Sequence, residues 1–521
     1  MNIAYILTEQ ARARATQTAI IDGKVGQEHQ TSFAELDRKA AQMAQVLHEA
    51  DLKKGDAVLV FQTMSVELYI LLTALFRLGL IAVFIDPSAE KGHLERCAKL
   101  YPLKALVASR KAHLLRFVSP ELRRIPLKFS LGWLPFTKDL NVFQSLDPFD
   151  EIEPCDADTP ALMTFTSGST GQPKAAVRTH GFLIAQHKAL ERSLELKAGE
   201  TDISTLPIFV LANLASGVTS LIPNVDLRKP GSVDPEPIVK QIKAFRPERL
   251  SASPAFLERI ASYAEDTQLK LEPLENIFTG GAPVFPGLLE RAQSSFPNAS
   301  VNAVYGSTEA EPIAHIAWHD LTDLDKEAMR FGKGLLVGKA TPDIQLRIIE
   351  NQWGQPLAKL GLSSFDAMSL KNKAGEIVVS GEHVLEGYLN GVGNEETKFD
   401  VNEACWHRTG DLGYLDGAGK LWLLGRASAV IQDNKGILYP FAVECATSHL
   451  SNIKRSAVVL HHNKRILIIE TENNSLIDSD IKQKLEWAKL DDVVFMELPV
   501  DKRHNAKIDY PELRRRLEHL R

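Results

Sequence analysis

Cysteine is scarce in this sequence, with four residues among 521. Cys97, Cys155, Cys405 and Cys445 lie far apart, form no CxxC pair and have no histidine at zinc-ligand spacing. This pattern argues against a disulfide framework and a structural zinc site, and it indicates free thiols in a reducing compartment. The N-terminus also lacks the basic and apolar stretch of a signal peptide, so we expect a cytoplasmic protein.

Basic residues are not in excess either. The formal net charge is −6, whereas a nucleic-acid-binding protein normally shows a basic face. The composition, 44% hydrophobic and 24% charged, is that of an ordinary globular protein. A chain of 521 residues is too long for one hydrophobic core. We therefore expect several packed units and no nucleic-acid partner.

Long uncharged apolar runs are absent as well. Residues 68–85 come nearest to a membrane span, at 18 residues, but they contain Arg77 and are interrupted at Gly79. A helix, a glycine stop and an apolar strand are a common order in α/β proteins. We expect a buried helix that ends near Gly79, a buried strand over residues 80–85, and no transmembrane segment.

Residues 110–136 combine basic with apolar side chains, including Arg116, Arg123, Arg124 and Lys128. A solvated amphipathic helix is the favoured interpretation of this segment. A surface that docks on a membrane or on a partner is the alternative.

Helical stretches alternate with short apolar runs over most of the chain, as in a parallel sheet covered by helices. Expected helices at residues 32–50 and 67–78 flank an expected strand at residues 57–62. After about Gly332, short strands alternate with turn residues, which predicts a small antiparallel sheet or barrel. The final residues, 427–521, predict a compact unit that has a sheet with helices on one side.

The strongest motif follows an apolar strand at residues 161–165. It reads Thr166-Ser-Gly-Ser-Thr-Gly171, followed by Pro173 and Lys174. Small hydroxyl and glycine residues leave backbone N–H groups available to surround phosphate oxygens, and Lys174 adds a positive charge. A flexible linker is the alternative, but linkers seldom follow a buried strand. The candidate phosphate-binding residues are Thr166, Ser167, Gly168, Ser169, Thr170, Gly171 and Lys174.

Two other phosphate or acyl chemistries are excluded by missing motifs. The pattern GxxxxGK[ST] of P-loop NTPases is absent. The nucleophile elbow GxSxG of α/β-hydrolases is absent too, because Gly168-Ser-Thr-Gly171 is one residue short.

The loop closely resembles the signature of the adenylate-forming superfamily, which includes acyl-CoA synthetases, non-ribosomal adenylation domains and luciferases. Further matching stretches, such as Tyr305-Gly-Ser-Thr-Glu309 and Trp406-His-Arg-Thr-Gly-Asp411, follow in the same order between about Ser32 and Lys507. The resemblance implies an α/β fold. Its large N-terminal domain, residues 1–426, would contain two helix-covered sheets and a small β-barrel, and a small mobile α+β lid domain would occupy residues 427–521.

The resemblance also implies an ATP-dependent ligase that converts a carboxylic acid to acyl-AMP with release of pyrophosphate. Tyr305 would stack on adenine, Thr308 would donate to a phosphate, and Glu309 would hold Mg²⁺ through oxygen. Asp411 would accept hydrogen bonds from the two ribose hydroxyls, as a carboxylate readily does. The other nucleotide-binding residues implied by the resemblance are Gly280, Gly281, Ala282, Gly306, Ser307 and Arg426.

Lys507 matches the C-terminal lysine that reaches into the adenylation site of this superfamily. Attack of a carboxylate on the α-phosphate joins two anions, so preorganised cations stabilise the transition state. The C-terminal unit would rotate about a hinge just after Arg426, here at Ser428, where many members carry Asp or Lys. Thr308, Glu309 and Lys507 are therefore the candidate catalytic residues.

Three departures concern the second half-reaction. Val210 stands where many acyl-CoA ligases have a histidine, Asn434-Lys435 replaces a glycine pair, and Ala506 replaces the glycine before the C-terminal lysine. Fewer glycines leave less room for a close backbone approach, which weakens the case for a CoA thiol site. The stretches Phe76-Arg-Leu-Gly79 with Ile85-Asp-Pro87, Pro207-Ile-Phe-Val210, Tyr305-Gly-Ser-Thr-Glu-Ala-Glu-Pro312 and Arg503-His-Asn-Ala-Lys-Ile-Asp509 resemble the olefin-pathway synthetases, which close an adenylated β-hydroxy acid into a β-lactone.

The acid and the acyl acceptor stay open at this stage. A fatty or β-hydroxy fatty acid is the favoured substrate, with either CoA or the internal hydroxyl as acceptor. An amino-acid or aryl-acid adenylating enzyme is an alternative, although residues 202–213 offer no obvious ammonium-binding aspartate. A catalytically silent acyl-binding protein of the same fold is a further alternative. Pathway enzymes are candidate partners.

Overall fold

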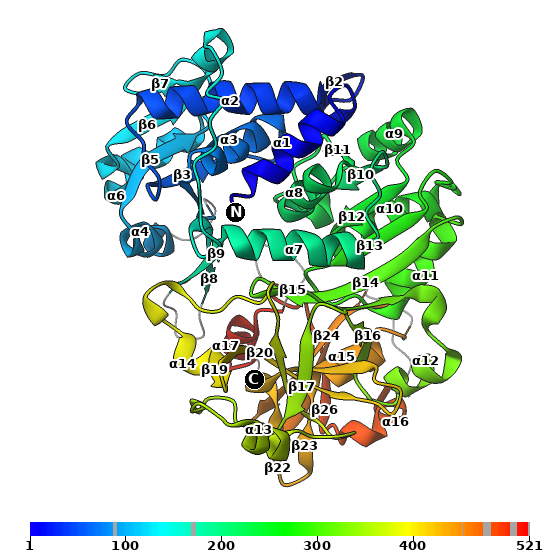
Figure 1. The fold of residues 1–521 in the computed structure, drawn as a ribbon. Coiled ribbons are helices and arrows are strands. Elements are labelled where there is room, and N and C mark those ends of the chain that lie inside the picture. Colours follow the sequence, from blue (N-terminus) through cyan, green and yellow to red (C-terminus); the bar gives the residue numbers. More distant parts are fainter. Residues whose placement is uncertain (87–90, 168–172, 451, 472–480, 501–507, 519–521) are drawn as a thin grey trace. The chain divides into compact units, whose positions relative to one another are not determined.

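The computed structural model describes residues 1–86, 91–167, 173–450, 452–471, 481–500 and 508–518. The chain divides into two compact units. The first contains residues 1–224 and 382–395, and the second contains residues 225–381 and 396–521. The mixed α/β fold that the sequence predicts is confirmed in both units (Figure 1).

A seven-stranded sheet forms the centre of the first unit, in the order β7-β6-β5-β3-β4-β8-β9. Neighbouring strands are parallel except for the antiparallel pair β8–β9. The strands are β3 (Ala57–Phe61), β4 (Ile81–Phe84), β5 (Leu103–Ala108), β6 (Leu127–Ser130), β7 (Lys138–Asp139), β8 (Pro160–Ser167) and β9 (Pro173–Thr179). All five residues of β3 are buried, because helices cover both faces of a parallel sheet.

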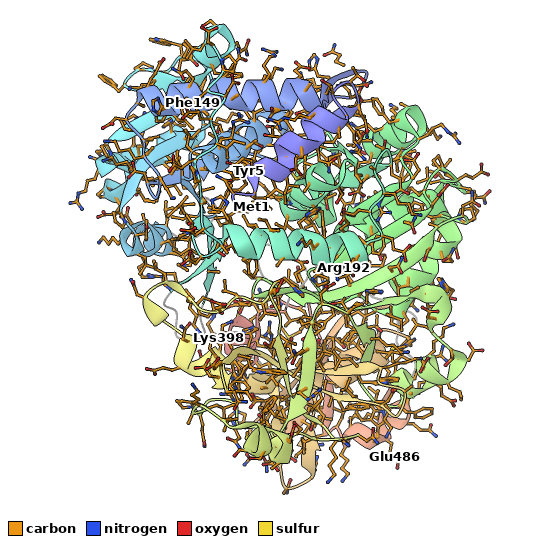
Figure 2. The ribbon with its side chains drawn as sticks, in the orientation of Figure 1. Met1, Tyr5, Phe149, Arg192, Lys398 and Glu486 are labelled. Atoms are coloured by element: carbon orange, nitrogen blue, oxygen red, sulfur yellow. The ribbon has the colours of Figure 1, made fainter. Side chains whose placement is uncertain are left out.

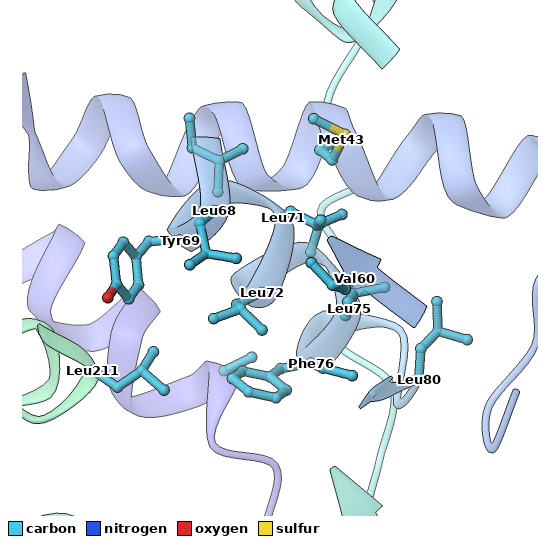
Figure 3. Close-up of a cluster of buried hydrophobic side chains, with 14 of the residues drawn as sticks. Met43, Val60, Leu68, Tyr69, Leu71, Leu72, Leu75, Phe76, Leu80 and Leu211 are labelled. Atoms are coloured by element: carbon cyan, nitrogen blue, oxygen red, sulfur yellow. The ribbon is translucent and has the colours of Figure 1, made fainter. Parts of the chain in front are cut away.

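The helices of the first unit include those that cover the two faces of this sheet. They are α1 (Ala4–Ala13), α2 (Phe33–Glu49), α3 (Val66–Arg77), α4 (Lys91–Leu100), α5 (Leu115–Val118), α6 (Pro120–Arg124), α7 (His180–Ser193) and α8 (Pro207–Ser216). Figure 3 shows the core on one face, where Leu68, Leu72 and Phe76 of α3 lie among side chains from neighbouring elements. The predicted helices at residues 32–50 and 67–78 are thus confirmed as α2 and α3.

Arg77 interrupts the apolar run of α3 for a structural reason. Its side chain is only 3% exposed, and its guanidinium pairs with Asp37 at 2.9 Å and donates to the carbonyls of Phe149 and Asp150. Gly79 follows with a φ of +63°, a backbone conformation that favours glycine, and β4 begins two residues later. Figure 2 labels Phe149 beside α2, where its ring stacks on His48 with centroids 4.8 Å apart.

No helix among the residues that the structure describes is long and apolar enough to cross a membrane. The four cysteines are free thiols.

A second sheet of the first unit pairs β10 (Thr201–Ser204) with β11 (Thr219–Leu221), β11 with β1 (Thr18–Lys24), and β1 with β2 (Gln27–Ser32). The first two pairings are parallel and the third is a hairpin. Ser32 ends this hairpin and caps α2, because its hydroxyl accepts a hydrogen bond from the Glu35 amide at 3.2 Å.

The second unit begins with alternating helices and parallel strands. These are α9 (Pro235–Phe245), β12 (Arg249–Ala252), α10 (Pro254–Asp266), β13 (Asn276–Gly280), α11 (Pro286–Ser295) and β14 (Ser300–Ser307). From β14 to β17 the strand pairings are antiparallel, in the order β14-β15-β16-β21-β20-β18-β17. The strands and helices of this region are β15 (Ala310–Ala317), α12 (Asp323–Arg330), β16 (Leu335–Ala340), β17 (Gln345–Ile349), α13 (Leu362–Met368), β18 (Gly375–Ser380), β19 (Lys398–Val401), β20 (Ala404–Leu415) and β21 (Leu421–Arg426).

Where the structure describes the residues after Arg426, they form two small sheets with α-helices beside them. The hairpin β22 (Ile431–Asp433) and β23 (Gly436–Leu438) precedes α15 (Pro440–Thr447). A three-stranded sheet follows from β24 (Ile453–His461), β25 (Lys464–Thr471) and β26 (Asp492–Phe495), with α16 (Ile481–Lys484) and α17 (Tyr510–Glu518).

The expectation that this last sheet has helices on one side is wrong. Val458 and Leu467 pack with Val443 of α15 in one core cluster. Val459 and Ile468, on the opposite face of the same strands, pack with Leu513 of α17 in another. Both faces of the hairpin strands are apolar, so both need a helix to cover them.

Candidate nucleotide site

The glycine-rich motif connects two paired strands of the first unit. β8 and β9 are antiparallel, with Thr166 opposite Lys174 and Ser167 opposite Pro173. The strand therefore runs two residues beyond the predicted end at Phe165 and includes Thr166 and Ser167. Gly168, Ser169, Thr170 and Gly171 lie outside the described residues.

Lys174 is fixed by its neighbours at the start of β9. The residue is 7% exposed, and its ammonium nitrogen lies 5.7 Å from the ring centroid of Tyr388. Its carbon stem passes so close to Gly393 that a β-carbon there would meet Lys174 Cε at 2.5 Å. Tyr388 and Gly393 thus fix the position of the Lys174 side chain. No motif around either residue predicted this role.

A hairpin of the second unit carries the aromatic motif. β14 ends at Ser307 and β15 begins at Ala310, so Thr308 and Glu309 form the connection between them. Thr308 is exposed and Glu309 is half-buried. The pairing register shifts between Tyr305 and Ser307, at Gly306. Gly280 ends the neighbouring parallel strand β13, where a β-carbon would meet the Val304 carbonyl oxygen at 2.6 Å. Gly281 and Ala282 follow at the end of that strand.

Asp411 and Arg426 face each other across a second strand pair. Asp411 lies within the strand β20 and pairs in register with Arg426 of β21. The Arg426 Nε atom lies 3.3 Å from Asp411 Oδ1, and Arg426 Nη1 donates to the Thr409 carbonyl at 3.0 Å. The Arg426 side chain is 58% exposed, so its charge can also reach a ligand.

The two strand pairs meet at a hydrogen bond between Tyr305 and Asp411. The Tyr305 hydroxyl donates to Asp411 Oδ2 at 2.8 Å. Burial raises the pKa of the Tyr305 hydroxyl well above its usual value, and the negative charge of Asp411 raises it further. The charge of Asp411 also raises the pKa of Arg426, with smaller contributions from Tyr305 and Glu309. Tyr305, Glu309, Asp411 and Arg426 therefore form one electrostatic cluster.

Two residues that the sequence did not single out support Asp411. The Thr409 hydroxyl accepts a hydrogen bond from the Asp411 backbone amide at 3.1 Å and donates one to the Ile377 carbonyl at 2.9 Å. Trp353 covers Gly410, where a β-carbon would meet the indole at 3.1 Å and Arg426 Nη1 at 3.3 Å. Gly410 has a φ of +75°, so glycine suits both its conformation and its crowding. Thr409 lies within the motif Trp406-His-Arg-Thr-Gly-Asp411, whereas no recognisable motif surrounds Trp353.

A buried ion pair holds β20 beside this cluster. Arg408 donates through Nε to Glu376 Oε2 and through Nη2 to Glu376 Oε1, both at 2.8 Å. The side chains are 0% and 1% exposed. Trp353 links this pair to the site, because the Arg408 guanidinium lies 5.3 Å from the centroid of its ring.

The residues present fit a magnesium ion that is bound mainly by the nucleotide. Among the described residues no group of three or more His, Cys, Asp or Glu side chains is placed to hold a metal by itself. Magnesium usually keeps several waters and binds one or two carboxylates together with substrate phosphates. Glu309, half-buried at a strand connection, offers one such carboxylate. The remaining candidate, Lys507, lies outside the described residues.

The chain belongs to the AMP-binding enzyme family, whose model matches residues 7–389. It is an AMP-forming acid ligase, and the resemblance to the adenylate-forming superfamily and its olefin-pathway branch is confirmed. The olefin beta-lactone synthetase of Stenotrophomonas maltophilia is 28% identical over 98% of this chain and 97% of its own length. That of Xanthomonas campestris is 29% identical over 88% of this chain and 84% of its own.

The fold has solved counterparts. The structure of ATP-bound MatB from Rhodopseudomonas palustris superposes with a TM-score of 0.79 and 20% identity, covering 99% of both chains.

Proposed function

We propose that the protein activates a fatty or β-hydroxy fatty acid as its acyl-adenylate and then closes the β-hydroxy acid into a β-lactone. The observation that carries the first step is the cluster of Tyr305, Asp411 and Arg426, joined by contacts of 2.8 and 3.3 Å. Among the described residues, each Asp411 oxygen has one protein partner and keeps a lone pair for a ribose hydroxyl. Arg426, partly exposed beside it, supplies a positive charge for the nucleotide.

The adenylation step is then a displacement at phosphorus. A carboxylate oxygen of the acid bonds to the α-phosphorus of ATP, the bond to the β,γ-pyrophosphate breaks, and pyrophosphate leaves. Negative charge builds on the phosphate oxygens, so cations placed in advance lower the barrier. We assign this work to Lys507 and Lys174, with Thr308 as a hydroxyl donor to a phosphate. Glu309 would hold Mg²⁺, which screens the phosphate charge when it is bound.

Two positions support an internal nucleophile in the second step. Val210 is fully buried in the core of the first unit and has no group that titrates, so it offers no base at this position. Lys435 lies in the turn between β22 and β23, and its side chain is anchored there: Nζ lies 2.5 Å from Asp491 Oδ1 and donates to the Lys489 carbonyl at 3.1 Å. A glycine pair at this turn would let the thiol-bearing end of CoA approach the backbone closely. The anchored lysine side chain reduces that access.

With a β-hydroxy acid, the substrate's own hydroxyl oxygen would attack the acyl carbon. The bond from that carbon to the AMP oxygen breaks, AMP leaves, and the hydroxyl proton passes to solvent. The products are a β-lactone and AMP, and no CoA is consumed. The names of the two bacterial relatives fit this second step. Transfer of the acyl group to CoA is the second candidate, because CoA ligases share the superfamily.

The test is a product analysis of the purified protein with ATP, Mg²⁺ and matched acids. A β-hydroxy fatty acid and the unsubstituted acid of the same length are each incubated with and without CoA. Without CoA, we expect AMP and β-lactone from the β-hydroxy acid. Without CoA, we expect no multiple turnover of the unsubstituted acid. AMP release that requires CoA for both acids, with acyl-CoA as the product, would contradict the lactone step and leave the adenylation step intact.

A further inference from the structure

Six large apolar side chains are exposed within one short stretch of the first unit. They belong to the segment at residues 110–142, which we call the 110–142 surface. Their exposed fractions are 62% for Leu114, 76% for Phe117, 53% for Val118, 73% for Trp133, 95% for Phe136 and 49% for Val142. Exposed apolar residues that gather in this way usually mark an interaction site. None of the six belongs to the nucleotide site.

The topology brings the two halves of this surface together. Residues 110–118 follow β5 and residues 131–137 follow β6, and these strands are parallel neighbours, so both segments leave the same edge of the sheet (Figure 1). The His113 ring Nε2 atom is 2.8 Å from the Phe129 carbonyl oxygen. The Arg110 guanidinium packs on Gly132, where a β-carbon would meet it at 2.5 Å. The helical segment and the loop are therefore one continuous surface.

The loop that presents the aromatic rings is held by its own hydrogen bonds. Ser130 donates its hydroxyl to the Gly132 carbonyl at 2.7 Å, and Thr137 donates to the Leu134 carbonyl at 2.8 Å. The Gly132 amide donates to Asp139 at 2.9 Å. These bonds close the loop at its base and leave Trp133 and Phe136 outside. The exposure of the two rings is thus built into the loop geometry.

The same surface is strongly basic. Residues 110–142 contain seven Lys or Arg side chains against two carboxylates, a net charge of +5 in a chain whose net charge is −6. Both carboxylates are engaged locally. Glu121 pairs with Arg124 at 2.6 Å, and Asp139 accepts two backbone amides at 2.9 Å. Burial lowers the pKa of Lys128, and the positive charge of Arg116 lowers it further, so cations are crowded here.

We propose that the 110–142 surface docks on the interface of an anionic lipid bilayer, with Phe117, Trp133 and Phe136 inserted among the lipid chains and the surrounding cations on the phosphates. Aromatic rings beside Lys and Arg are the pattern of interfacial membrane binding. A second copy that presented the same surface would bring two like charges of +5 together, which disfavours a symmetric dimer. The proposal does not depend on which acid the enzyme activates.

The experiment is vesicle flotation of the full-length protein at low and high salt. Vesicles of phosphatidylglycerol and phosphatidylethanolamine are compared with vesicles of phosphatidylcholine alone. We expect binding to the anionic vesicles, weakened by salt, and little binding to the neutral ones. The variant Phe117→Ser/Trp133→Ser/Phe136→Ser is expected to bind at least about tenfold more weakly, because each ring removed loses buried apolar area. Lys111→Gln and Arg123→Gln are each expected to weaken binding about fivefold.

Matched controls separate docking from general surface stickiness. Phe331→Ser and Leu362→Ser remove side chains of similar exposure, 61% and 59%, from the second unit and are expected to leave binding unchanged. Pyrophosphate exchange with a short water-soluble acid is expected to be unchanged in all these variants, which shows that they fold. Equal binding to both kinds of vesicle would overturn the proposal, as would binding that survives loss of the three rings. Sedimentation of the wild type as an oligomer that the triple variant dissociates would assign the surface to a second copy and overturn it as well.

Discussion

The Tyr305 hydroxyl donates to the Asp411 carboxylate at 2.8 Å and so joins two motifs that are 106 residues apart in the chain. The bond orients the carboxylate that we assign to the ribose. Tyr305→Phe removes the donor and leaves the ring in place. A hydrogen bond to a charged group contributes about 1.5–3 kcal/mol, so we expect the KM for ATP to rise roughly tenfold or more, with a smaller change in kcat. ATP-dependent pyrophosphate exchange measures both.

Tyr414→Phe is the matched control for this change. Tyr414 lies on β20, the strand that also carries Asp411. Its hydroxyl donates to the Lys333 carbonyl at 3.0 Å and not to Asp411. The control is expected to keep the KM for ATP of the wild type. Equal effects of the two substitutions would mean that loss of any hydroxyl on these strands perturbs the site.

Lys507 is expected to act in the adenylation step alone. Removal of one preorganised group that stabilises developing negative charge commonly costs about 10²–10³ in rate. We therefore expect Lys507→Ala to lower pyrophosphate exchange by roughly this factor without a change in Tm. Lys454→Ala, which removes an exposed lysine of the same C-terminal segment, serves as the control. Exchange at the wild-type rate in Lys507→Ala would remove Lys507 from the mechanism.

The buried pair of Arg408 and Glu376 is expected to be the most sensitive ion pair near the site. Glu376→Ala leaves the Arg408 charge buried without its carboxylate, which costs about 3–5 kcal/mol in the free energy of unfolding. A calorimetric scan should show a large decrease in Tm. Asp226→Ala breaks a bidentate pair with Arg228 whose side chains are 49% and 73% exposed, and it should change the Tm little. Similar losses in both variants would contradict the role given to burial.

Glu444 makes the stability of the C-terminal segment depend on pH. Burial raises the pKa of this carboxyl to about 7, although the Tyr510 hydroxyl that donates to it works in the opposite direction. Between the unfolded pKa of 4.5 and the folded value, the folded protein keeps a proton that the unfolded chain has released. Stability is therefore highest at the acid end of this window and falls as pH rises through it, by up to about 1.4 kcal/mol per pH unit.

Glu444→Gln removes the titration and keeps an acceptor for Tyr510. We expect the Tm of the variant to decrease less than that of the wild type between pH 5 and pH 7, where only the folded wild type still holds the Glu444 proton. Scanning fluorimetry over this range gives the difference. Parallel curves for the two proteins would show that folding does not raise the pKa of Glu444 above its unfolded value.

Much of the fold could be predicted because its elements have local signals. Helix α2 begins where Ser32 caps it and β3 is a short, fully buried run, so periodicity and capping residues located them within two residues. The face covered by α17 was missed because β24 and β25 are apolar on both sides, and sequence alone does not tell which helix covers which side.

The site was predictable as motifs and not as contacts. Asp411 and Arg426 could be named, but their partnership depends on the pairing of β20 with β21, which no residue pattern specifies. Trp353 and Tyr388 were missed for the same reason. Trp353 contacts Gly410 and Tyr388 contacts Lys174 only in the folded chain. Their neighbours in the sequence form no phosphate-binding or nucleotide-binding motif.

The most direct test of acid activation by this chain is acid-dependent exchange of labelled pyrophosphate into ATP by the purified protein with Mg²⁺. A panel of fatty, β-hydroxy fatty, aryl and amino acids is assayed without CoA, so that only the first half-reaction is measured. We predict exchange with fatty and β-hydroxy fatty acids, and its loss in the Lys507→Ala variant. Absence of exchange with every acid would contradict the account, and exchange with amino or aryl acids alone would contradict the proposed substrate.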